Sequence, residues 1–258
     1  MPNLTLPAPL THALGRRSAG ERMAARAGMA IAGLGALALG GFAAYVVRER
    51  AQEQPRHDVL ESDGAFSLRH YSGGLTAETR RIGARDTAMR SAFGTLAGYI
   101  FAKPGGRAAH ADDRKIAMTV PVTAAPDAEL GGSDEGGSGA GGAEWIVRFN
   151  LPSKWTKSNL PIPGPGVTIA ERPARTVAVV QFAGNAKDEN LVAQNRAKLL
   201  AWIERRGWTA TSEPEFAGYN APIIPGPLRR NELWIEVFGT AGEADRAPYG
   251  SPGLRIDA

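Results

Sequence analysis

One order of secondary-structure elements occurs twice along this chain, and it constrains the fold more than any other feature. Each copy has two short alternating apolar segments, one amphipathic helix and two further apolar segments. In the first copy we expect a helix over 84–102 and strands at 66–71, 75–80, 116–123 and 145–151. In the second copy we expect a helix over 186–206 and strands at 167–171, 176–182, 216–219 and 233–238. Since one unit alone would leave a sheet face exposed, the pattern predicts an α+β fold: a distorted antiparallel β-barrel made from two pseudo-repeated strand-strand-helix-strand-strand units.

Local signals mark the turns and the helix ends. Ser72, Gly73 and Gly74 separate the first two strands and predict a hairpin turn between them. Asn185 can cap the second helix, and Gly207 ends it.

A long apolar segment precedes the repeated units. Residues 27–47 contain no charge, and as a helix they would span roughly 31 Å, close to the ~30 Å hydrocarbon core of a bilayer. We therefore expect one N-terminal transmembrane helix, with a cleaved signal peptide or a buried core helix as the alternatives. Four arginines precede the segment and three follow it, which favours the extracytoplasmic, periplasmic side of the membrane for the following domain.

The rest of the chain divides by composition and charge. We expect a basic tail at 1–26, the anchor at 27–47, a tether at 48–58, a ligand-binding domain at 59–238 and a disordered tail at 239–258; residues 131–143 form a flexible Gly-rich insert. The net charge of +4 lies in residues 1–56, which carry seven basic and three acidic residues, whereas the remainder carries 23 of each. A neutral body without a basic stripe argues against nucleic acid as a partner.

The absence of cysteine excludes several kinds of chemistry. A chain without cysteine has no disulfide, thiolate metal site, cysteine nucleophile or covalent c-type heme attachment. No nucleophile–base motif, metal-ligand spacing or nucleotide fingerprint is present either, so we do not expect an enzyme.

Three segments resemble signatures of the SOUL heme-binding family, in the same order and with similar spacing. Residues 115–122 (Lys-Ile-Ala-Met-Thr-Val-Pro-Val), 219–222 (Tyr-Asn-Ala-Pro) and 229–234 (Arg-Arg-Asn-Glu-Leu-Trp) are similar to Lys-Ile-x-Met-Thr-x-Pro-Val, Tyr-Asn-x-Pro and Arg-Arg-Asn-Glu-[Val/Ile]-Trp. The resemblance covers about residues 58–238. It implies a distorted barrel with two helices and a shallow apolar groove that binds heme, or another tetrapyrrole, non-covalently.

The same resemblance implies an iron ligand. The stretch Leu68-Arg69-His70-Tyr71 is similar to one in vertebrate members whose histidine is the proposed axial ligand, so His70 is the candidate ligand of the heme iron. The alternative is a strand histidine that is satisfied by its neighbours. Met118 could also offer its sulfur to iron, although a methionine in an apolar strand usually serves packing.

Further residues are implied around the porphyrin. Arg90 and Phe93 match positions that line the groove, where Arg90 would approach a propionate, and Met89 lies beside them. Each of these three residues could instead belong to a solvated helix face or to the core. Arg229 and Arg230 could meet propionates, or they could form an ion-pair network with Glu232.

The function expected from these features is a membrane-anchored heme or tetrapyrrole carrier, buffer or sensor. One alternative is an effector-binding module for another flat hydrophobic molecule. A hydrolase that uses Glu232 with Tyr219 as an acid–base pair is a further alternative, as is an anchored domain with a purely structural role.

Overall fold

The computed structural model describes residues 52–108, 112–127, 143–221 and 223–239. Four predicted segments lie outside the described residues: the basic tail 1–26, the anchor 27–47, the insert 131–143 except Ala143, and the tail 239–258 except Gly239. Within the described part of the chain, no helix combines the length and the apolar character that crossing a membrane requires. Residues from Gln52 onward belong to one compact unit.

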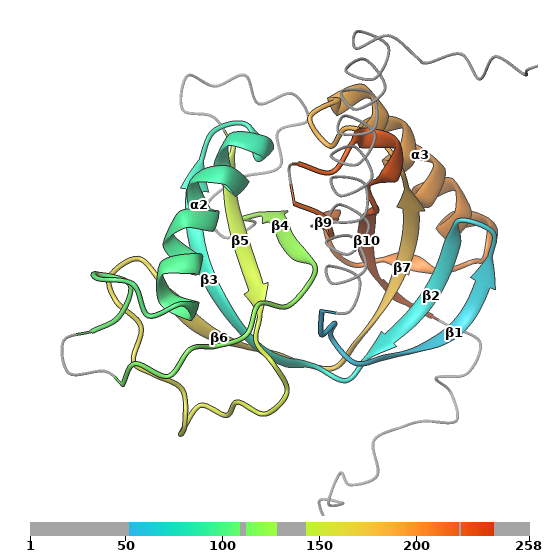
Figure 1. Cartoon of the computed structure of the whole chain (residues 1–258). Helices are drawn as coiled ribbons and strands as arrows, with labels where there is room; N and C mark the ends of the chain where they lie inside the picture. Colours follow the sequence, from blue (N-terminus) through green and yellow to red (C-terminus); the bar gives the residue numbers. More distant parts are fainter. Residues whose placement is uncertain (1–51, 109–111, 128–142, 222, 240–258) are drawn as a thin grey trace, which may run out of the picture. The chain divides into compact units, whose positions relative to one another are not determined.

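Ten antiparallel strands and two α-helices build the described part of this unit (Figure 1). The strands are β1 His57–Asp63, β2 Phe66–Tyr71, β3 Gly74–Ile82, β4 Val122–Pro126, β5 Glu144–Asn150, β6 Thr168–Arg172, β7 Arg175–Phe182, β8 Thr209–Ala210, β9 Glu215–Gly218 and β10 Asn231–Phe238. The helices are α2 Arg85–Ile100 and α3 Glu189–Arg205, and a 3-10 turn, η1, spans Gly226–Leu228. The strands pair in the order β1-β2-β7-β10-β9-β4-β5-β3-β6, and β8 pairs with β10. A mostly antiparallel sheet with two helices confirms the predicted α+β class.

The strand order confirms the internal repeat and corrects the predicted hairpins. Read outward from the central β9–β4 pair, β10, β7 and β2 on one side correspond to β5, β3 and β6 on the other. The first strand of each repeat therefore pairs with the second strand of the other repeat, as β2 does with β7 and β6 with β3. The predicted hairpin at Ser72–Gly74 is wrong, because β2 and β3 lie in different halves of the sheet.

The two crossover links touch each other, which explains the glycine signal. Gly73 has φ +82°, and a Cβ at this position would lie 2.6 Å from the carbonyl oxygen of Arg172, the last residue of β6, and 3.0 Å from the backbone of Pro173 and Ala174 in the link to β7. Only glycine fits such a close approach with a positive φ. A local Ser-Gly-Gly signal is thus common to a hairpin and to this crossover, and only the distant pairing partner distinguishes them.

The sheet is open, so the predicted barrel is not confirmed. Its hydrogen-bonded order ends at β1 and at β6, and no pairing joins these two strands in the described residues. The predicted strand 116–123 is also shorter than expected: residues 116–121 run as an extended connection and the regular pairing of β4 begins at Val122. β1 begins at His57, inside the segment that the sequence places in the tether.

Each helix covers one half of the sheet. α2 packs on a cluster that includes Leu96, Ile100 and Phe149, and α3 packs on a cluster that includes Trp202 and Leu233. Burial of each such side chain stabilises the fold by roughly 1.5–3 kcal/mol. The N-cap of α3 is Asp188, whose carboxylate accepts the backbone N–H of Leu191, so the predicted cap at Asn185 is three residues early.

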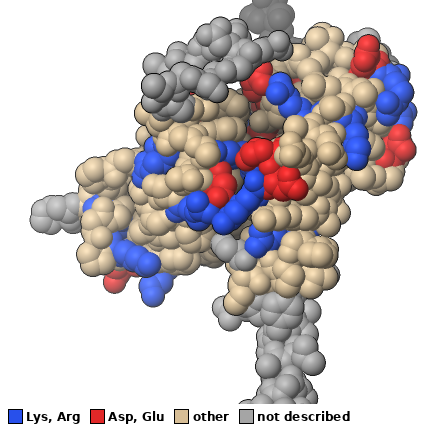
Figure 2. Space-filling model, turned by 90° about the horizontal axis from the view of Figure 1, so that it is seen from above, with Lys and Arg blue, Asp and Glu red and all other residues tan. Residues whose placement is uncertain are grey.

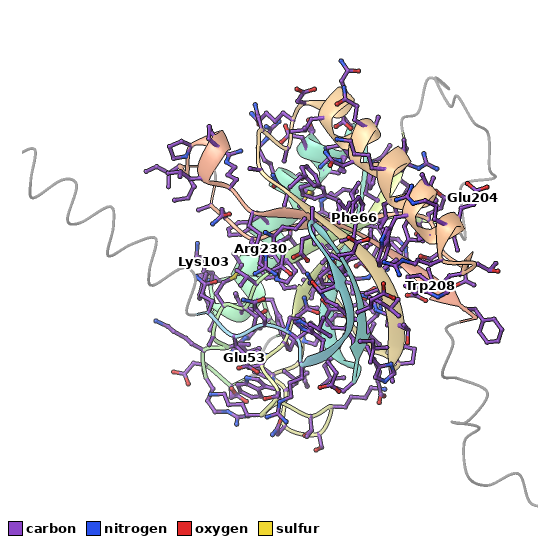
Figure 3. The ribbon with its side chains drawn as sticks, turned by 90° about the vertical axis from the view of Figure 1, so that its right-hand side faces the viewer. Glu53, Phe66, Lys103, Glu204, Trp208 and Arg230 are labelled. Atoms are coloured by element: carbon purple, nitrogen blue, oxygen red, sulfur yellow. The ribbon has the colours of Figure 1, made fainter. Side chains whose placement is uncertain are left out.

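The strands of the second half carry a different set of side chains on the face opposite α3. Tyr71, Val177, Val179 and Trp234 form a third apolar cluster there. Figure 3 shows the division: Glu204 and Trp208, at the end of α3, lie on one side of the strands, and Arg230 and Glu53 lie on the other.

Candidate functional site

The solvent-facing side of α2 combines apolar side chains with a guanidinium group. Phe93 is 44% exposed, and its ring meets Phe149 edge-on at 5.3 Å between centroids. Met89, one turn earlier, is half-buried and packs against the core clusters of both halves of the sheet. Arg90 is exposed and forms an ion pair of 2.5 Å with Asp86 on the same helix. The structure therefore brings Met89, Arg90 and Phe93 together on one helix face.

Two glycines lie beside this face, one next to open space and one in close contact with its neighbours. A Cβ at Gly94 would meet no atom within 4 Å, although glycine costs an exposed helix about 1 kcal/mol relative to alanine. A Cβ at Gly218, where β9 ends, would lie 3.3 Å from the Phe216 ring and 3.9 Å from the Met89 methyl. The absence of a side chain at Gly94 leaves room for a flat molecule along α2, whereas Gly218 lets β9 pack closely against Phe216 and Met89.

A loop between β9 and β10 adds exposed apolar side chains. Ile223 is 72% exposed and Leu228 is 54% exposed, whereas Ile224 between them is buried. The Gly184 N–H donates to the Gly226 carbonyl, and the Arg229 Nε donates to the Ile224 carbonyl at 2.6 Å, so the backbone of this loop is held in place. The loop leaves the sheet directly after Gly218 and so starts next to Met89.

Arg230 is bound to a buried carboxylate, while about a third of its side chain, 33%, stays exposed. The Glu232 side chain is fully buried, and its two oxygens accept six hydrogen bonds from the side chains of Arg69, Tyr219, Arg230 and Trp234. The Arg230 guanidinium also lies 3.7 Å above the Tyr219 ring. The ion-pair alternative for Arg230 with Glu232 is therefore the one that the structure shows.

The same contacts are unsuitable for acid–base chemistry. Burial would raise the pKa of Glu232, but Arg69 and Arg230 more than offset it and hold that pKa below its ordinary value. The pKa of the Tyr219 hydroxyl is raised, first by burial and then by the charge of Glu232. A carboxylate that stays ionised and a phenol that stays protonated do not exchange a proton with a substrate near neutral pH.

His70 lies in a different part of the domain. It shares the α3 face of β2 with Phe66 and Leu68, and its Nδ1 is 3.1 Å from the Thr176 hydroxyl. In the sheet, His70 pairs with Thr176 of β7. Phe182, six residues further along β7, pairs with the first residue of β10. At about 3.3 Å per residue, His70 is roughly 20 Å along β7 from the start of β10 and its preceding arginines.

Met118 and His57 also have structural surroundings. Met118 is half-buried and packs on the cluster under α2. It therefore serves packing, which was the alternative to binding iron. The His57 ring lies 4.8 Å from the Tyr71 ring, and its Nδ1 is 3.0 Å from the Pro55 carbonyl. His12 and His110 lie outside the described residues.

Sequence reasoning missed a set of charged residues on the sheet face opposite the helices. Arg148, Arg172 and Arg175 surround Glu215, and together they line a cavity of about 280 Å³. A signal was present at Arg148, which lies in sequence between the buried core residues Val147 and Phe149.

The fold is an open antiparallel sheet with two helices, built from two repeats. The chain belongs to the SOUL heme-binding protein family, whose family model matches residues 52–236. It is 33% identical over 154 residues to Heme-binding protein 1 of Sus scrofa, an alignment that covers 58% of this chain and 71% of the relative. The predicted family is confirmed, and its description names the expected cofactor, heme.

Solved structures with a related arrangement have very different sequences. The C-terminal domain of EcmrR is 12% identical with a TM-score of 0.47, and the match covers 67% of this chain and 96% of that chain. A hydrolase from Listeria innocua is also 12% identical, with a TM-score of 0.48 and coverage of 69% and 94%.

The family signatures hold the site in place. Ile116 and Val120 of the first signature belong to two different core clusters, so this segment joins the halves of the domain. Asn220 of the second accepts the backbone N–H of Arg230 at 2.6 Å, and Glu232 of the third carries the buried carboxylate.

Proposed function

We propose that this protein binds heme, or a closely related tetrapyrrole, non-covalently along α2 and the loop between β9 and β10. The observation that carries the proposal is the exposed Phe93 ring beside the open helix backbone at Gly94, with the Arg90 guanidinium one turn before. A porphyrin needs an apolar surface for its face and a cation for its propionates. Membership in the SOUL family and the heme-binding relative support the same ligand.

Among the predicted arginines, Arg90 fits a propionate best. Its ion pair with Asp86 is exposed to solvent, so a propionate can replace that partner at little cost. Arg230 is committed to Glu232, and Arg229 donates to the Ile224 carbonyl. We assign these two arginines to fixing the loop, which presents Ile223 and Leu228 to the porphyrin.

We assign no axial ligation to His70 at this site, because His70 pairs with Thr176, which lies roughly 20 Å along β7 from the start of β10. Bound heme would supply iron-centred absorption and redox chemistry, while Phe93, Met89 and Arg90 would hold its face and its propionate. The protein therefore resembles a buffer or carrier, which must release its ligand, more than a permanently loaded heme enzyme.

A hemin titration of the full-length chain tests the proposal. Saturable one-to-one binding with a shifted Soret band is expected, measured against a blank that contains any detergent in use. Phe93→Ala should weaken binding by about tenfold or more, Arg90→Gln should weaken it by roughly two- to fivefold because its ion pair is exposed, and His70→Ala should leave it unchanged. Arg196→Gln is the matched control, since the side chains of Arg196 and Arg90 are 53% and 52% exposed and each pairs with one acidic residue.

Loss of the Soret shift in His70→Ala alone would move the site to β2. Failure of wild-type protein to saturate with hemin, together with binding of other flat aromatic compounds, would favour an effector-binding module.

We also propose that residues 27–47 anchor the protein in a membrane with the heme-binding domain on the periplasmic side. The support is the uncharged apolar segment and the arginines on both sides of it. A periplasm-dependent reporter fused after Ala258 should be active. Activity only of a cytoplasmic reporter would reverse this orientation.

A further inference from the structure

A second cavity lies on the sheet face opposite the helices, where the two halves of the domain meet. It has a volume of about 280 Å³, near the lower end of small-molecule pockets, which range from roughly 300 to 1,000 Å³. Thr123 and Arg148 reach it from β4 and β5 of the first half, and Glu215 and Trp234 reach it from β9 and β10 of the second. Neither α2 nor the β9–β10 loop contributes a lining residue, so this cavity is distinct from the proposed heme site.

The arginines of this cavity have hydrogen-bonding capacity that the protein does not use. Arg172 contacts Glu215 and Glu236 through Nη2 alone, at 3.4 and 3.5 Å, which is long for a charged pair. Its Nε and Nη1, and Nη2 of Arg148, have no hydrogen-bond partner among the described residues. The Arg172 guanidinium, held by such long contacts, and the Nη2 of Arg148 can bind a further anion.

An indole in the wall also lacks a partner. Trp155 lines the cavity and is 9% exposed, and its buried Nε1–H makes no hydrogen bond to the described residues. Leaving a buried donor unpaired costs about 1–3 kcal/mol, so such groups in native proteins usually meet a ligand or water. This is a second observation, independent of the arginines, that favours a polar ligand.

The charges that line the cavity indicate the charge of the ligand. Four arginines and three glutamates line it, and two further glutamates, Glu78 and Glu236, pair with these arginines from beside the cavity. Burial would raise the pKa of Glu215, but Arg175, Arg172 and Arg148 lower it to about 2, so this carboxylate stays ionised. Because these carboxylates already offset the arginine charges, the unused guanidinium N–H groups suit a ligand with a single negative charge, whereas a phosphate dianion would be repelled by Glu215.

Apolar groups define the other part of the ligand. Leu75, Leu151 and the Tyr71 and Trp234 rings line the cavity together with the arginines. We propose that the cavity is a second binding site, for a small organic monocarboxylate with an apolar body. The carboxylate binds the unused N–H groups of Arg172 and Arg148 and the Trp155 N–H, and the apolar body packs against the aromatic wall.

The test compares benzoate with benzamide, which has nearly the same shape without the charge. Calorimetric titration of the full-length chain without hemin should show saturable benzoate binding and at least tenfold weaker benzamide binding. Arg172→Gln should weaken benzoate binding about tenfold or more, and Trp155→Phe, which removes the N–H and keeps an aromatic ring, by roughly two- to tenfold. Arg196→Gln, on the far side of the domain, should have no effect.

Several results would overturn the proposal. The first is that benzoate does not bind at concentrations up to about 10 mM. The second is that benzoate and benzamide bind equally well. The third is that benzoate binding survives both the Arg172 and the Trp155 substitutions. Thermal unfolding of each variant checks that it is folded. Phe93→Ala keeps the two sites distinguishable, because it should lose hemin binding and retain benzoate binding.

Discussion

Replacing Glu232 by glutamine should destabilise the domain strongly, because this carboxylate neutralises two arginines inside the protein. The Glu232 side chain is fully buried and accepts two hydrogen bonds from Arg69, two from Arg230, one from Tyr219 and one from Trp234, at 2.7–3.2 Å. Glutamine keeps the shape but removes the charge and turns an amide N–H₂ toward these donors.

The expected loss of stability follows from the arginine charges that stay buried after the substitution. Removing one partner of a buried ion pair costs about 3–5 kcal/mol, because the other charge stays buried without compensation. For a domain of this size, 1 kcal/mol corresponds to about 2–4 °C in the midpoint of thermal unfolding. The midpoint should therefore fall by roughly 6–20 °C, and the free energy of unfolding from urea titration should fall by about 3–5 kcal/mol.

Two further variants make this prediction specific. Glu213→Gln breaks an exposed pair with Arg196 at 3.5 Å and should change the free energy of unfolding by no more than about 1 kcal/mol. In an Arg69→Met background, Glu232→Gln should cost less than in the wild type, since one of the two stranded charges is gone. A loss below about 1 kcal/mol for Glu232→Gln alone would refute the role assigned to this carboxylate.

Three other changes test the account of the fold. The pKa of Glu215 is about 2 in the folded protein against an ordinary value of 4.5, so this group contributes roughly 3 kcal/mol of stability that is present above about pH 4.5 and is lost as pH falls towards 2. In urea titrations at a series of pH values, Glu215→Gln should be less stable than the wild type near pH 6 and should lose less stability below pH 4.5. The same dependence of stability on pH in both proteins would contradict this. Asp188→Ala removes the cap of α3 and should cost about 0.5–2 kcal/mol by urea unfolding, whereas the same change at Asn185 should cost less. Gly106→Ala should lower the unfolding midpoint by several degrees, because its Cβ would lie 2.3 Å from the Gly98 carbonyl carbon; an unchanged midpoint would show that this loop can move.

Periodicity and end signals predicted the elements well. The helix expected at 84–102 is α2, Arg85–Ile100, and the one expected at 186–206 is α3, Glu189–Arg205. Both have an apolar stripe that fixes their buried face without knowledge of the partner. Motif residues likewise identified the family, which the match over 52–236 confirms.

Long-range pairing could not be predicted from the same signals. The exchange of β2 and β6 between the halves depends on which strand each meets across the sheet, and the Ser72–Gly74 turn is compatible with either outcome. β1 was missed because an edge strand that is mostly exposed lacks apolar alternation. Its polar character is the ordinary way of protecting a sheet edge from aggregation.

The charged groups show a similar limit. Sequence reasoning selected Arg229 and Arg230 by their position before the last strand, and the structure turns Arg230 onto Glu232 and Arg229 onto the loop backbone. On the face seen in Figure 2, the described basic and acidic residues lie interleaved, so many of these charges have an opposite charge nearby. Whether an arginine is available to a ligand depends on how it is paired inside the protein. Among the predicted residues Arg90, Arg229 and Arg230, it is Arg90 whose ion pair, with Asp86, lies at the surface.

The most direct test of the central claim is an NMR titration of the full-length chain with zinc protoporphyrin, a diamagnetic stand-in for heme. The account predicts that the largest backbone amide shifts cluster on Met89 to Gly94 and on Ile223 to Leu228, with little change at His70. Shifts centred on His70 and its β1 and β7 neighbours would contradict it and would place the heme site on the other side of the domain.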